Sequence, residues 1–199
     1  SQIEIGFNPA YQDLVLHTAA VWREGTSIPQ LVGDQVRVYD EESGLSGYVV
    51  EGRQTAVLLL EDVRVGDVID YSYTLRGANP VFEGHYAREF PLGTTAPVAR
   101  LHVRLLWEGA GEPRFLPHRT EASPTVTRSG NRTEYVWDLR ATPAVPFESL
   151  APVWYRANPA VQVSDFGSWS EVAEWGRRLF PVGHELPREL VPVADEISR

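Results

Sequence analysis

Apolar and polar residues alternate along much of the chain, which predicts extended strands. In residues 97–107 every second residue from Ala99 to Trp107 is apolar, and two arginines and a histidine lie between them. Further strands are predicted at 14–22, 35–39, 48–50, 55–60, 68–75, 133–139 and 161–163. Many short strands separated by turn residues predict a mainly β fold, an antiparallel β-sandwich, with a closed barrel as the alternative.

The same alternation predicts which side chains reach the core. Trp22, Trp107 and Trp137 each fall on the apolar side of their strand, so we expect all three to be buried. In 14–22 this side also carries Leu14, Leu16 and Ala20. In 68–75 the odd-numbered residues are apolar and the even-numbered ones are polar.

The period changes after residue 163. Ser168 and Glu171 form a capping box, and apolar residues follow at helical spacing up to Leu179. A second short helix is predicted between Leu186 and Ile197. We therefore expect a β-sandwich at 1–163 and, at 164–199, the helical start of a truncated second domain.

Composition removes several functions. The 199 residues include 27 acidic residues and 18 arginines, no lysine, no cysteine and no methionine, for a net charge of -9. An acidic chain is a poor nucleic-acid ligand, and no apolar run approaches the ~20 residues of a membrane-spanning helix. Without cysteine or lysine the chain has no thiol nucleophile, thiolate metal ligand or Schiff-base amine. We predict no cofactor and no metal.

No local motif identifies a catalytic centre. The five histidines lack zinc-ligand spacing, and no serine sits in a G-x-S-x-G turn. The acidic run at 40–42 indicates a solvated loop more than a calcium site. An enzyme in its own right would need a pocket that joins His85, Asp67 and a serine.

One stretch carries a more specific signal. Residues 55–73, continuing through 76–82, resemble the DUF3857 family, a domain found N-terminal to transglutaminase-like domains in many bacterial proteins. The turn at Gly66-Asp67 and the segment Asn79-Pro80 are the most specific parts, and the resemblance extends over nearly the whole chain. It implies an immunoglobulin-like sandwich followed, after Arg199, by a papain-like Cys-His-Asp domain. It also implies an exported protein, periplasmic or membrane-associated.

These observations predict a non-catalytic accessory domain that positions the downstream domain or its substrate. The expected interdomain patch consists of Arg64, Asp70, Arg76, Asn79, Trp154, Trp169 and Trp175. The alternative is a free-standing module that binds a glycan or a peptide, which predicts a row of exposed coplanar aromatic side chains.

Overall fold

The computed structural model describes residues 1–31, 35–41, 52–109, 111–146, 155 and 157–180. These residues form a mainly β protein with antiparallel sheets and one α-helix. The chain divides into two compact units, Ser1–Gly84 and His85–Arg199.

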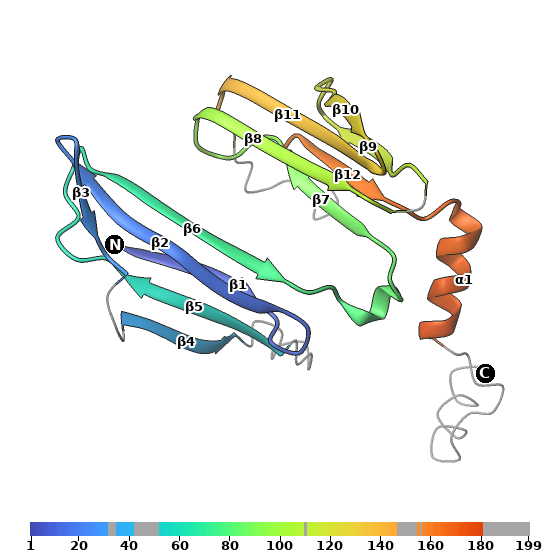
Figure 1. The fold of residues 1–199 in the computed structure, drawn as a ribbon, viewed down its shortest axis with the longest axis horizontal. Coiled ribbons are helices and arrows are strands. Elements are labelled where there is room, and N and C mark those ends of the chain that lie inside the picture. The colour runs from blue at the N-terminus through green and yellow to red at the C-terminus, as the bar shows by residue number, and fades with distance from the viewer. Residues whose placement is uncertain (32–34, 42–51, 110, 147–154, 156, 181–199) are drawn as a thin grey trace, which may run out of the picture. The chain divides into compact units, whose positions relative to one another are not determined.

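The first unit contains two three-stranded sheets, ordered β1-β5-β4 and β3-β2-β6 (Figure 1). Its elements are β1 (Gln2–Phe7), β2 (Asp13–Arg23), β3 (Thr26–Pro29), β4 (Val36–Glu41), β5 (Arg53–Leu59), β6 (Val68–Arg76) and a 3-10 helix (Pro80–Phe82). A single core draws side chains from both sheets: Ile3, Ile5, Ala19, Leu58 and Leu60 are buried together. Burying these apolar surfaces is what holds the two sheets together.

The pairing of β2 with β6 contains a one-residue irregularity. Leu16 lies opposite Tyr73, but Thr18 lies opposite Ser72, so His17 is an extra residue in β2. An extra residue in one strand is a β-bulge, and it reverses which face the following side chains occupy.

The bulge corrects the predicted faces of this strand. Beyond it Ala19 and Val21 are the buried residues, with 4% and 1% of their surface exposed. Trp22 is 41% exposed, so the prediction that it lies in the core was wrong. Ala20, predicted on the same side as Trp22, alternates with the buried pair in the same way. The prediction assumes an unbroken two-residue alternation over 14–22, and the bulge at His17 interrupts it.

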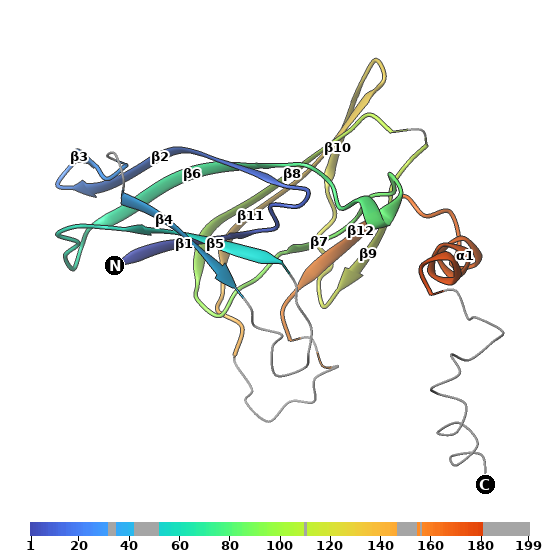
Figure 2. The same ribbon diagram turned by 90° about the horizontal axis from the view of Figure 1, so that it is seen from below.

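The second unit also contains two three-stranded sheets, ordered β10-β11-β8 and β7-β12-β9 (Figure 2). Its elements are β7 (Ala87–Pro91), β8 (Val98–Trp107), β9 (Arg114–His118), β10 (Thr125–Ser129), β11 (Arg132–Thr142), β12 (Ala160–Ser164) and α1 (Trp169–Leu179). Trp137 is 1% exposed in a core shared with Leu105 and Val163, and Trp107 packs against that core. The prediction of burial is confirmed for Trp137, while Trp107 is partly buried at the border of the core.

The helix α1 begins as the sequence indicates. Ser168 is its N-cap and accepts a hydrogen bond from the Glu171 N–H at 3.2 Å, while the Glu171 carboxylate accepts one from the Gly167 N–H. Both contacts satisfy amide groups that a helix leaves without partners at its start. The second predicted helix, like the predicted strand at 48–50, lies outside the described residues.

The predicted first domain, 1–163, spans the boundary between the two units at Gly84 and His85. Alternation identifies strands one by one, but it does not indicate which strands share a core.

Gly77, directly after β6, lies close to the backbone of Tyr11. Its φ is 116°, and a Cβ atom there would lie 1.9 Å from the Tyr11 carbonyl oxygen. Gly66 has a similar φ of 96°, but a Cβ atom there would meet nothing within 4 Å. We expect Gly66→Ala to cost about 1–2 kcal/mol, the usual penalty of a left-handed backbone, and Gly77→Ala to cost clearly more. Urea unfolding of the two variants measures the difference, and equal losses would contradict the close approach.

Candidate functional site

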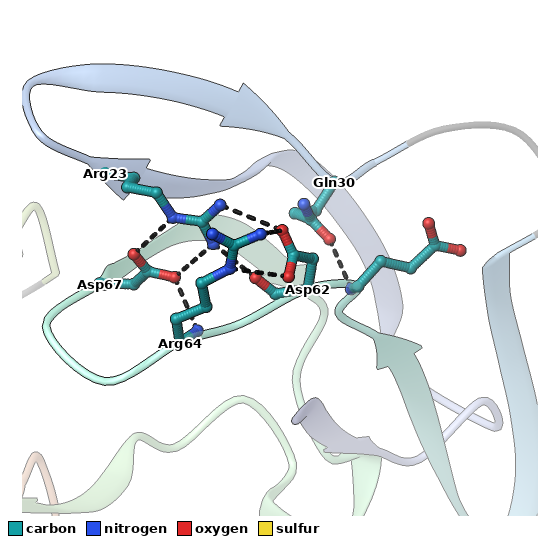
Figure 3. Close-up of polar contacts among 6 residues, drawn as sticks. Arg23, Gln30, Asp62, Arg64 and Asp67 are labelled. Atoms are coloured by element: carbon teal, nitrogen blue, oxygen red, sulfur yellow. Dashed lines mark hydrogen bonds and ion pairs between the residues drawn. The ribbon is translucent and has the colours of Figure 1, made fainter.

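An ion-pair cluster joins the end of β2 to the connection between β5 and β6 (Figure 3). Arg23 donates through Nε and Nη2 to the two carboxylate oxygens of Asp67, at 3.0 and 2.8 Å. Its Nη1 donates to Asp62 at 3.0 Å, and Arg64 donates to both oxygens of Asp62 at 2.9 and 2.7 Å. Two arginines and two carboxylates therefore form one connected network. Its forked Arg23–Asp67 contact has the geometry of strong arginine–carboxylate pairs.

The connection between β5 and β6 contains a tight turn that positions Asp67. Gly66 takes a positive φ of 96°. The Asp67 carboxylate accepts the Arg64 N–H at 2.7 Å, while the Asp67 N–H donates to the Arg64 carbonyl at 3.1 Å. Hydrogen bonding to the backbone of its own turn is a common role of aspartate.

The cluster also fixes the charges of its members. The side chain of Asp67 is only 3% exposed. The hydrogen bond from Arg23, followed by the one from the Arg64 N–H, lowers the pKa of Asp67 to about 2. The pKa of Asp62 is lowered chiefly by Arg64 and then by Arg23. Hydrogen bonds to Asp67 and Asp62 raise the pKa of Arg23, so all these groups stay ionised near neutral pH.

A small pocket of about 200 Å³ lies beside the cluster, lined by Val21, Arg23, Ile28, Pro29, Gln30, Glu61 and Asp62. Gln30 is 6% exposed, and its side-chain oxygen accepts the Glu61 N–H at 2.8 Å. The backbone N–H of Gln30 donates to the Ala19 carbonyl at 2.8 Å. These hydrogen bonds connect neighbouring backbone segments and give the buried polar groups of Gln30 their partners.

The four polar residues of the predicted patch lie along β6 and not in one cluster. Arg64 precedes the strand, Asp70 and Arg76 lie on it, and Asn79 follows it and accepts the Val81 N–H at 3.0 Å as cap of the 3-10 helix. The strand has nine residues, which extend over roughly 30 Å. Arg64 alone of the four belongs to the ion-pair cluster.

The aromatic members of the predicted patch belong to the second unit. Trp169 is the first residue of α1 and is 85% exposed. Trp175 is half-buried on the same helix, with its ring centroid 5.7 Å from that of Phe166. Trp154 lies outside the described residues.

A groove of about 240 Å³ separates α1 from the sheet β7-β12-β9. Its lining combines Arg114, Phe115 and Leu116 of β9, Gln162 and Ser164 of β12, Phe166, Gly167 and Ser168 of the connection, and Trp169 and Val172 of α1. Most of this lining is apolar, and Leu116 is 53% exposed. The groove therefore suits an apolar side chain of another polypeptide better than a charged ligand.

His85 fixes the connection behind this groove. Its Nδ1 lies 3.0 Å from the Asp165 carboxylate and its Nε2 lies 3.8 Å from that of Glu171. Its ring stacks on Phe166 at a centroid distance of 4.1 Å. These contacts tie the start of the second unit to the end of β12 and to α1. Asp165, and not Asp67, is thus the hydrogen-bond partner that the structure gives His85.

Sequence reasoning did not identify Arg23, Asp62 or Asp165 as site residues. Arg23 and Asp67 are 44 positions apart, and they become neighbours because β2 and β6 pair with Trp22 opposite Val68. No local motif signals such a contact, because it is a product of strand register.

The described residues contain no cluster that could hold a metal ion and no helix that could span a membrane. No group of three or more histidine or acidic side chains among them could hold a metal ion. None of their helices has the length and apolarity needed to cross a membrane.

Comparisons with known proteins identify a family and a fold. The model of DUF3857, a domain of unknown function with a solved structure, matches residues 1–146. The chain is similar, at 18% identity and a TM-score of 0.76, to the crystal structure of a putative protease from Parabacteroides distasonis ATCC 8503. The match covers 89% of this chain and 35% of that one, so the chain spans about a third of the solved protein. No curated protein matches the chain.

The lowered pKa of Asp67 predicts an acid-sensitive contribution to stability. Because the folded state holds this pKa at about 2 against an ordinary 3.8, the ionised carboxylate stabilises the fold above pH 3.8, and the contribution is lost as the pH falls towards 2. We expect Asp67→Asn to be less stable than the wild type at pH 7, with the difference shrinking between pH 3.8 and 2. Thermal unfolding across this range measures it.

Asp13→Asn is the matched control, since this exposed carboxylate has no hydrogen-bond partner among the described residues. It should change stability little at any pH. A loss for Asp67→Asn that stays constant from pH 7 to 2 would mean that the ion pairs are not its cause.

Proposed function

Since the chain belongs to the DUF3857 family, we propose that it is a non-catalytic accessory domain of a larger protein. It would precede a transglutaminase-like domain and position that domain or its substrate. The chain has no cysteine, so a thiol nucleophile would have to come from other residues of the parent protein. The setting we propose is an exported one, periplasmic or membrane-associated, as in many bacterial members of the family.

The proposal includes a finer description of the fold. We assign each unit to the antiparallel β-sandwiches, of the immunoglobulin-like kind. In support, each unit has one core to which two three-stranded sheets both contribute. Two sheets around a shared core are the defining feature of this architecture.

The observation that carries the proposal is the exposed aromatic surface of α1. Trp169 is 85% exposed at its start and Phe180 is 77% exposed just past its end. Trp169 also borders the apolar groove. Large apolar side chains left in water beside a groove are typical of a surface that contacts another domain, because aromatic residues bury much area there.

The glycan-binding alternative receives weaker support. Tyr71 and Tyr73 have nearly parallel rings, 6° apart in orientation, and are 46% and 43% exposed. Trp22 is exposed as well, but its register partner Val68 places it on the opposite face of the sheet. The described residues thus offer a pair of aromatic rings and not the row that a glycan platform needs, so we do not advance it.

The parent sequence provides the first test. We expect a cysteine, then a histidine, then an aspartate or asparagine within the next ~100–150 residues, one domain length. A parent protein without this cysteine would rule out the catalytic partner.

Trp169→Ala in the parent protein tests the contact surface. If Trp169 packs against the next domain, its truncation should weaken the coupling between the two domains by about 2 kcal/mol, as for a central aromatic contact. In calorimetric unfolding of the parent protein, weaker coupling separates the unfolding transition of the accessory domain from that of the following domain. Trp22→Ala removes an exposed tryptophan from the first unit and should leave the coupling unchanged; equal effects of both substitutions would contradict the assignment.

A further inference from the structure

The strand β6 of the first unit has an open edge. β6 pairs with β2 on one side, and within the described residues no strand pairs with its other side. It has nine residues and no proline. Long edge strands without proline are ready templates for pairing with another strand.

Apolar side chains accompany this open edge. Ile69, Tyr71 and Tyr73 are 39%, 46% and 43% exposed. Ile69 lies opposite Val21 and Tyr71 opposite Ala19, and both of these β2 residues are buried, so the exposed row is on the core-facing side of the sheet. These three large exposed apolar side chains lie on the core-facing side of β6, whereas no other described strand carries more than two in all. The border of the core is therefore least covered at β6.

The other face of β6 carries two charges of opposite sign. Asp70 and Arg76 are both exposed, and neither forms an ion pair with any described residue. Arg76 has Asp13 as its register partner on β2, but the two side chains do not form an ion pair. The two charges are six positions apart on the same face of one strand.

We propose that two copies of this chain associate through their β6 strands, paired antiparallel and centred on Tyr73. In this register Asp70 lies opposite Arg76 of the partner subunit, and the symmetry repeats the pair. Tyr71 lies opposite Leu75 of the partner subunit, and Tyr73 opposite its own copy. Opposite charges and aromatic–aliphatic pairs in direct register are the contacts that stabilise antiparallel strands.

The charges select this register over its neighbours. Centring the pair on Ser72 would place Asp70 opposite Thr74, and centring it on Tyr71 would place Asp70 opposite Ser72. Only the Tyr73 centre opposes both charges with their complements. The strand is thus complementary to itself, which favours a second copy over an unrelated peptide as the occupant. Such an isologous contact closes on itself and yields a dimer.

Charge reversal tests the pairing. Asp70→Arg and Arg76→Asp each create two like-charge pairs, and we expect each to raise the dimer dissociation constant about tenfold or more. The double variant restores opposite charges and should return to near wild-type association. A mixture of the two single variants should form a heterodimer, since every pair is then complementary. Sedimentation equilibrium measures all four samples, and circular dichroism confirms that each variant is folded.

Arg37→Asp is the matched control, because it makes the same charge change on β4, in the other sheet, and should leave association unchanged. A wild-type chain that stays monomeric at every concentration overturns the proposal, and so does association that ignores the reversals. A monomer that instead takes up an extended peptide at β6 overturns it too.

Cross-linking gives a readout that does not depend on charge. The chain has no cysteine, so Tyr73→Cys introduces a single thiol at the proposed two-fold axis. Directly opposed residues of antiparallel strands are close enough for a disulfide. We expect mild oxidation to link Tyr73→Cys into a covalent dimer and to leave Tyr39→Cys, from an equally exposed tyrosine on β4, as monomer. The reverse result, or equal linkage of both, overturns the proposed register.

Discussion

The register between β2 and β6 is the constraint on which the rest of the first unit depends. The extra residue at His17 turns Ala19 and Val21 towards the core and Trp22 towards solvent. A shift of one residue would exchange these faces and leave apolar surface in water on one side and polar groups in the core on the other. Because the core residues of β1 and β5 pack against this face, one local irregularity determines how both sheets meet.

The same register assembles the ion-pair cluster. Pairing continues to the end of β2, so Arg23 emerges beside the turn that carries Asp62 and Asp67. The hydrogen bonds of the cluster connect β2 to the loop that directly precedes β6. Both oxygens of each carboxylate accept hydrogen bonds, and these bonds lower the pKa values of Asp62 and Asp67. Strand register and the turn at Gly66 are therefore sufficient to account for this polar cluster.

Much of the architecture follows from the sequence. The features that could not be predicted all have the same cause. The alternation in 97–107, the burial of Trp137 and the cap at Ser168 depend on residues close in sequence, and the structure has all three. The bulge at His17 and the contact of Arg23 with Asp67, 44 positions away, depend on how distant strands align. The division at Gly84 depends on which strands share a core. Local periodicity carries no information about alignment or sharing, so these features could not be predicted from one sequence.

The described residues offer two surfaces of different chemistry, and each suits a different proposed role. The edge of β6 offers unpaired backbone with alternating apolar and charged side chains, which suits a strand. The groove beside α1 offers an apolar hollow bordered by Trp169, which suits side chains of a folded neighbour. The first surface belongs to residues before Gly84 and the second to residues after it. The proposed self-association and the proposed contact with a following domain therefore draw on different residues, so substitutions can test them separately.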